Sequence, residues 1–168
     1  MPLLRQEANL YVGALPDGIE GIEATLALMS QVVNVYKKDP EITALARDTI
    51  TGLAKRYAAQ AAALLRLVQE NVQYTLGPEG VQQLQTPDNT LAMGHGYCTD
   101  MATLLASLLA SVGHPTRFIA ASIFQQPMWH VWVQTKIGDR WVDADATMED
   151  APLGWAPPGI EEWRIYHN

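Results

Sequence analysis

One segment constrains the fold of this chain more than any other, the nearly unbroken apolar stretch at Ala102–Val112. Three small hydroxyl residues interrupt it, and Gly113 follows, as glycine commonly does just past a helix end. This pattern predicts a helix from Cys98 to Val112 that is buried on nearly all sides. The stretch is shorter than the roughly 18–20 apolar residues of a membrane span, so other parts of the protein must cover the helix.

Strand-like segments follow this helix, at Thr116–Ile123, Trp129–Lys136 and Arg140–Thr147. Gly138-Asp139 between the last two is a strong signal for a tight hairpin. The residues before the apolar stretch favour helices instead, and we expect these near 17–36, 39–55 and 57–72. The expected fold is α+β, with N-terminal helices and a buried Cys-bearing helix packed on a small antiparallel sheet.

We expect a single domain over residues 1–168, with a helical lead at 1–75, a catalytic core at 76–150 and an irregular tail at 151–168. Asp17 is the expected N-cap of the first helix, with Glu20 completing a capping box. Gly77–Gly80 is an expected turn. The tail is expected to be irregular because prolines and glycine gather there, at Pro152, Pro157, Pro158 and Gly159.

The charge and the cysteine count exclude several classes of function. The net charge is −7, from 11 basic and 18 acidic residues, which disfavours binding to nucleic acid or to an anionic membrane. A single cysteine, Cys98, excludes an intramolecular disulfide and a multi-cysteine zinc site. Met1–Leu10 lacks the apolar core of a secretory signal, so a cytoplasmic location is expected.

Cys98 is a candidate nucleophile because it opens the buried helix. The positive end of the helix dipole favours a thiolate there, and the free N–H groups of the first turn could hold an oxyanion. A lone buried cysteine is also common as a small apolar residue, so its chemistry depends on what lies nearby.

His130 and Asp145 are the groups that could activate this thiol. In a strand His130 shares its face with Trp132, and a two- or four-residue hairpin loop puts Asp145 diagonally opposite on that face, roughly 7–8 Å away between backbones. A three-residue loop would put the two residues on opposite faces. Asp143 lies on the same face as Asp145 and is the competing partner for the histidine.

Together these residues resemble the transglutaminase-like superfamily of papain-like cysteine enzymes, in particular its short phage- and prophage-encoded members. The resemblance covers roughly residues 20–150. It is carried by the ordered motifs Gly96-Tyr-Cys98-Thr-Asp100, Leu104 to Gly113, Thr116-Arg117-Phe118, His130-Val-Trp132 and Trp141-Val-Asp-Ala-Asp145-Ala-Thr147. Tyr97, Thr99 and Ala146 depart from the pattern, where acidic residues and a proline are usual.

The resemblance implies that Cys98 is the nucleophile, His130 the general base and Asp145 the residue that orients it. The spacing from Trp141 favours Asp145 over Asp143. Gln85, or the backbone N–H of Cys98, is the candidate donor to the oxyanion, while Asp100 is expected to cap the helix or anchor its loop.

We therefore expect cysteine-dependent acyl transfer on a peptide or amide substrate, without a cofactor. Hydrolysis is expected ahead of transglutaminase-type transfer, since 168 residues leave no room for a separate acceptor-binding domain. The alternative is a catalytically weak phage or prophage virion or assembly protein that keeps the fold, located in the bacterial cytoplasm or the virion and bound to other virion proteins. An iron site formed by His95, His130 and Asp145 is a weaker alternative, and no metal is expected.

Overall fold

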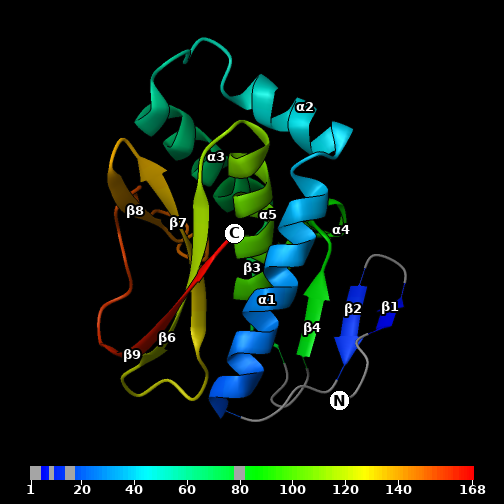
Figure 1. Ribbon diagram of the computed structural model, residues 1–168, viewed down its shortest axis with the longest axis vertical. Coiled ribbons are helices and arrows are strands. Elements are labelled where there is room, and N and C mark those ends of the chain that lie inside the picture. The colour runs from blue at the N-terminus through cyan, green and yellow to red at the C-terminus, as the bar shows by residue number, and fades with distance from the viewer. Residues whose placement is uncertain (1–4, 8–9, 14–17, 78–81) are drawn as a thin grey trace.

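The structure, a computed structural model, describes residues 5–7, 10–13, 18–77 and 82–168, and it is an α+β fold (Figure 1). The helices are α1 (Gly18–Tyr36), α2 (Pro40–Thr49), α3 (Tyr57–Asn71), α4 (Pro87–Met93) and α5 (Cys98–Ser111). The larger sheet holds β6 (Thr116–Ile123), β7 (His130–Ile137), β8 (Arg140–Ala144) and β9 (Ile160–His167). Its strand order is β8-β7-β6-β9, with every neighbouring pair antiparallel. The expected fold class is confirmed.

Two smaller sheets complete the described part of the chain. The first joins β1 (Arg5–Glu7), β2 (Leu10–Gly13) and β4 (Gln82–Gln85) in antiparallel order. The second is a short parallel pair of β3 (Gln73–Tyr74) and β5 (His95–Gly96). This pair matters for function, because β5 leads directly into α5.

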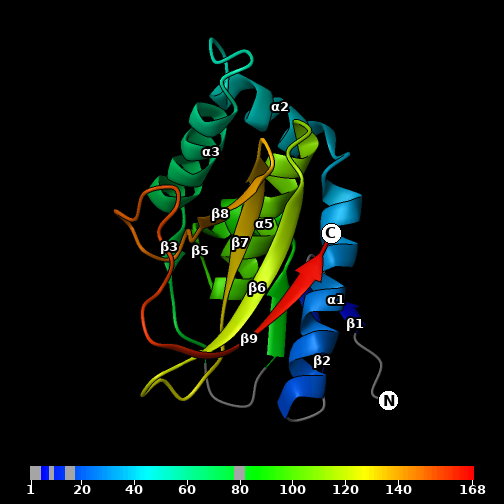
Figure 2. The same cartoon turned by 60° about the vertical axis from the view of Figure 1, so that its left-hand side comes forward.

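Helix α5 is the centre of the core. It lies between α1 and the larger sheet, with α2 and α3 toward its C-terminal end (Figures 1 and 2). Every residue from Asp100 to Leu109 is buried. The hydroxyl groups of Thr103 and Ser107 donate to the carbonyls of Thr99 and Thr103, each at 2.7 Å, so they add no unpaired polar atom to the core.

The hairpin β7–β8 has the two-residue turn that the sequence indicates. Ile137 pairs with Arg140, and Gly138 takes the positive φ of 64° that such a turn requires. One face of the sheet packs on α5 through residues such as Phe118 and Val133. The opposite side, here called the outer face, carries a small separate apolar cluster around Ile119, Ala121 and Trp132.

The N-terminal helices follow local sequence signals. Asp39 caps α2, its Oδ1 accepting from the N–H groups of Glu41 and Ile42 at 3.0 Å, with Pro40 at the first helical position. Helix α2 ends at Thr49, not near residue 55 as expected. The capping role of Asp17 and the turn at residues 78–80 lie outside the described residues. None of the described helices is both long and apolar enough to span a membrane.

The tail is not irregular as expected, because residues 160–167 form β9 and pair with β6. The prolines and glycine that indicated an irregular tail all lie before residue 160, and an alternating pattern follows them. Trp163 and Ile165 fall on one face and Arg164 and Tyr166 on the other, the pattern of a half-covered strand. The short strands β1, β2 and β4 were not expected either, since they lie in segments with few β-branched residues.

A buried histidine makes the stability of this fold depend on pH. His114 Nε2 lies 2.9 Å from Gln60 Oε1, and Gln60 Nε2 donates to the Leu53 carbonyl, so the imidazole Nε2–H is the donor in this pair. Burial lowers the pKa of His114. The unfolded chain therefore takes up a proton near pH 6.5 that the folded chain resists, and stability falls as pH drops below that value.

We expect His114→Ala to lower the free energy of unfolding by about 1–3 kcal/mol at pH 7.5, because Gln60 loses a buried partner. The difference between the two proteins should shrink at pH 5, where the wild type alone carries the penalty for His114. Urea unfolding at both pH values measures this. A difference that stays constant or grows at pH 5 would contradict the assignment.

Candidate active site

Cys98 is the first residue of α5, where the short β3–β5 pair holds the chain that precedes it. The N–H groups of Gln73 and Thr75 donate to the carbonyls of Gly94 and Gly96, both at 2.9 Å. These bonds fix the backbone just before the cysteine. Cys98 is partly exposed, and a residue that is to meet a substrate needs such exposure.

Asp100, one turn into α5, binds the loop to the helix. Its Oδ2 accepts from the backbone N–H of Tyr97 at 2.8 Å, which is the reciprocal bond of a capping box. Its Oδ1 accepts from the backbone N–H of Gln85 at 2.8 Å. Burial raises the pKa of this carboxyl group, although the bonds from Gln85 and Tyr97 oppose the effect. The expected role of Asp100 as cap and loop anchor is confirmed.

Gly96 makes this close packing possible. A Cβ at this position would lie 2.8 Å from Cβ of Asp100 and 3.2 Å from its Oδ2. The methyl group of Thr90 would be 3.4 Å away on another side. The backbone before Cys98 can therefore approach the buried carboxylate only because residue 96 has no side chain.

His130 and Asp145 are joined by a short, buried hydrogen bond. His130 Nε2 lies 2.7 Å from Asp145 Oδ2, and the two side chains are 11% and 1% exposed. The other carboxylate oxygen accepts from the backbone N–H and the hydroxyl of Thr147, at 3.0 and 2.8 Å. Both oxygens of Asp145 are thus held, and the carboxylate in turn holds the imidazole ring.

The charge on His130 is strongly stabilised by its neighbours. Burial alone would lower the pKa of His130, but hydrogen bonds with Asp145 and Cys98 and the negative charges of both raise it to about 10. Because Nε2 is bound to Asp145, the opposite ring nitrogen is the one left for Cys98. The arrangement places a proton between a thiol and an imidazole whose far side is fixed by a carboxylate.

Comparison with known proteins gives this geometry a family. The family model described as the transglutaminase-like superfamily matches residues 43–146, which include Cys98, His130 and Asp145. The chain belongs to the transglutaminase-like superfamily. Among curated proteins, none matches the sequence closely enough to count as a relative.

Solved structures of other proteins share the fold of this chain. A proposed cysteine protease from Cytophaga hutchinsonii aligns with a TM-score of 0.56 at 18% identity, covering 79% of this chain and 52% of that one. A proposed protease from Parabacteroides distasonis aligns with a TM-score of 0.57 at 14% identity, covering 90% of this chain and 32% of the other. The chain thus spans about half and about a third of their lengths, and the likeness concerns the fold alone.

Asp143 and Gln85, the sequence candidates for orienting His130 and for binding the oxyanion, have other hydrogen-bond partners in this transglutaminase-like chain. Asp143 Oδ1 accepts from Trp132 Nε1 and Gln134 Nε2, both at 2.8 Å, so its carboxylate serves the sheet and not His130. Gln85 Nε2 donates to the His95 carbonyl and to Asp100 Oδ2, both at 3.2 Å. These contacts make Gln85 part of the loop anchor, and its oxyanion role stays a prediction.

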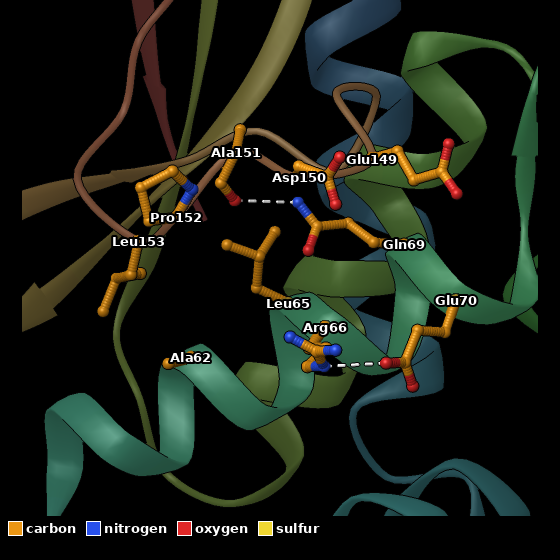
Figure 3. Close-up of a pocket in the computed structure, with 10 residues that line it drawn as sticks. All are labelled: Ala62, Leu65, Arg66, Gln69, Glu70, Glu149, Asp150, Ala151, Pro152 and Leu153. Carbon is orange, nitrogen blue, oxygen red and sulfur yellow. Dashed lines mark hydrogen bonds and ion pairs between the residues drawn. The ribbon is translucent and has the colours of Figure 1, made fainter.

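The loop that follows Asp145 is tied to α3. Gln69 Nε2 donates to the carbonyls of Met148 and Ala151, at 2.8 and 2.9 Å, and Figure 3 shows the second of these bonds. These two bonds fix the backbone that follows Thr147 to α3. Among the described residues, no three His, Cys, Asp or Glu side chains are placed to hold a metal ion.

Tyr74 is a residue of the site that sequence reasoning did not single out for chemistry. It ends β3, pairs with Gly96 in β5, and its ring meets the His130 ring edge-on with centroids 6.4 Å apart. Burial, together with the charges of Cys98 and Asp145, raises the pKa of Tyr74 to about 12. The phenol is therefore a proton donor at neutral pH. A two-residue parallel strand gives no periodicity from which to infer this position.

The close approach at Gly96 leads to a direct test. We expect Gly96→Ala to destabilise the protein by about 1–3 kcal/mol, because the new methyl group would overlap Cβ of a buried side chain that has no room to move. Urea unfolding measures the loss, and alkylation of Cys98 reports whether the loop has shifted. A variant with the wild-type unfolding midpoint would show that the loop accommodates a side chain.

Proposed function

We propose that this transglutaminase-like chain is a thiol enzyme that attacks amides, with Cys98 as nucleophile, His130 as acid and base, and Asp145 as the residue that orients His130. The observation that carries the proposal is the buried 2.7 Å bond between His130 and Asp145 beside the cysteine that opens α5. An imidazole fixed by a carboxylate and bonded to a thiol is the arrangement that activates a sulfur nucleophile.

The chemistry follows from the charges. The Cys98 thiolate adds to the carbonyl carbon of the amide, and the carbonyl electrons move onto oxygen. As the carbon–nitrogen bond breaks, protonated His130 gives its proton to the departing amine, which leaves a thioester on Cys98. His130 then removes a proton from water, whose attack releases the acid, or from an acceptor amine, whose attack forms a new amide.

The oxyanion of each addition step needs donors. The backbone N–H of Cys98 lies in the first turn of α5, where N–H groups have no partner within the helix. The Tyr74 phenol is the side-chain donor that we assign, because its ring meets the His130 ring edge-on and the charge of Cys98 contributes to its raised pKa. Gln85 is the weaker choice, since Asp100 and the His95 carbonyl already take its amide hydrogens.

A peptide amide is the first substrate class to test. The two structural neighbours with proposed protease activity support this choice. A virion or assembly protein that keeps the fold remains the rival, and the rival predicts an unreactive thiol. The contacts of His130 with Asp145 and Thr147 support the enzyme over this rival, since they hold the imidazole in the orientation that the proposed chemistry needs.

The proposed ion pair predicts how Cys98 reacts across pH. We expect iodoacetamide to label wild-type Cys98 nearly as fast at pH 6 as at pH 8, because imidazolium at His130 persists until the pH nears its pKa of about 10. In His130→Ala the rate should rise steeply with pH over this range, as it does for a thiol that has no cationic partner. Mass spectrometry of the intact protein measures both rates, and Cys98→Ala is the blank.

A wild-type rate that follows the ordinary thiol profile would contradict the ion pair and favour the rival. Both Cys98→Ala and His130→Ala should also abolish turnover of any amide substrate while leaving the fold intact. Circular dichroism checks the fold of each variant, and wild-type turnover in either of them would refute the proposal.

The assignment of Tyr74 is tested with p-nitrophenyl acetate. Acylation by this ester passes through an oxyanion, whereas alkylation by iodoacetamide does not. We expect Tyr74→Phe to lower the ratio of the acylation rate to the alkylation rate roughly a hundredfold, the usual effect of losing one oxyanion donor. Tyr97→Phe, which removes the hydroxyl of the tyrosine directly before Cys98, is the matched control and should keep the wild-type ratio. An unchanged ratio in Tyr74→Phe would exclude the role.

A further inference from the structure

Side chains on the outer face of the larger sheet form rows that run across its strands. Register places His130, Ala121 and Trp163 in one row. Trp132, Ile119 and Ile165 form the next. Neighbouring rows are two residues apart along a strand, roughly 6.6–6.8 Å. The second row is therefore the part of the outer face adjacent to the proposed catalytic histidine.

A pocket of about 260 Å³ lies over this second row. Ile119, Trp132 and Ile165 belong to its lining, and Ile160 and Trp163 of β9 also line it. Trp163 is 55% exposed and Ile160 39%, so large apolar side chains at the pocket meet solvent. Whole small ligands occupy pockets of roughly 300–1,000 Å³, so this volume suits one or two side chains.

The polar groups of the pocket bind one another. Gln134 Nε2 and Trp132 Nε1 both donate to Asp143 Oδ1, and Gln134 Oε1 accepts from Arg117 Nε at 2.8 Å. The Arg117 guanidinium also lies 4.3 Å from the centroid of the Trp141 ring. With these groups engaged, the pocket offers an occupant mainly apolar surface.

Trp132 connects this pocket to the proposed active site. Its ring stacks on the His130 ring with centroids 5.8 Å apart and an angle of 24° between the planes. Only 2% of Trp132 is exposed, and its Nε1–H is bound to Asp143, so the ring is fixed. The same side chain lines the pocket and supports the imidazole.

We propose that this pocket is a substrate subsite for a bulky apolar side chain, of the size of Leu or Phe, within two residues of the amide that Cys98 attacks. This inference rests on the proposed function and names the substrate class for that site. An extended peptide rises about 3.3 Å per residue, so two residues span the distance between the rows.

Another pocket, between α3 and residues 149–153, measures about 530 Å³ and is less suited to this role (Figure 3). Four charged side chains line it, Arg66, Glu70, Glu149 and Asp150. Arg66 and Glu70 pair with each other at 2.7 Å. The hydrogen-bond and ring partners of His130 include Asp145, Thr147, Tyr74 and Trp132, and none of these four residues lines this pocket.

The test uses peptidyl acyloxymethyl ketones that label Cys98 and carry Leu, Phe or Ser in the two positions beside the reactive group. Each labelling rate is divided by that of iodoacetamide, so that changes in thiol reactivity cancel. For the wild type we expect the Leu and Phe probes to exceed the Ser probe by roughly tenfold to a hundredfold, from burial of one apolar side chain.

Trp163→Ala and Ile160→Ser should each reduce this preference several-fold, because both remove apolar surface from the pocket. Val35→Ala, which alters a 67%-exposed apolar residue of α1, is the matched control and should keep the wild-type preference. Equal rates for all probes in the wild type, or a preference unchanged in both pocket variants, would overturn the subsite.

Failure of the proposed function is a different result. In that case iodoacetamide labels Cys98 only at the rate of an ordinary thiol, and the subsite falls with the function. If a second copy of the chain fills the pocket instead, the wild type is a dimer in sedimentation experiments and Trp163→Ala is a monomer, which also overturns the proposal.

Discussion

The site depends on a carboxylate buried at the start of a buried helix. Asp100 accepts hydrogen bonds from the backbones of Tyr97 and Gln85, and so joins α5, its entry loop and β4 at one point. Burial raises the pKa of Asp100, which means that holding its charge in the core costs stability. The gain is a fixed backbone before Cys98, which gives the proposed nucleophile a defined position before any substrate binds.

The sheet supplies the second half of the site through register alone. A two-residue turn sets the β7–β8 pairing, and that pairing brings Asp145, just beyond β8, opposite Trp132 and diagonal to His130, the first residue of β7. Asp145 thus reaches His130 from the end of a strand, where its carboxylate can also accept the Thr147 N–H. Helix and sheet meet at one end of the sheet, because α5 packs on the face that carries Val131 and Val133 and its N-terminus lies where β7 begins. Cys98 is thereby within hydrogen-bonding reach of His130.

The parts of this structure that sequence alone predicts are those with strong local signals. The buried helix, the hairpin turn and the capping of α2 by Asp39 each follow from a few adjacent residues, as does the capping role of Asp100. The roles of Tyr74, Gln85 and Asp143 do not, because each depends on which groups the fold places beside the side chain. Asp143 is the clearest case. It shares a face with Asp145, and only the indole and amide groups that surround it decide that it serves the sheet.

Membership of the superfamily concerns the fold. Under the proposed function, the choice of substrate has to come from surfaces beside Cys98, His130 and Asp145. Trp132 limits how that choice can vary, since its ring both lines the outer-face pocket and stacks on His130. A substitution there would alter the imidazole and the pocket together. Trp163 and Ile160 touch the pocket from β9, a strand that holds none of the proposed catalytic residues. If the proposed subsite selects substrates, specificity can therefore change through β9 without moving Cys98, His130 or Asp145.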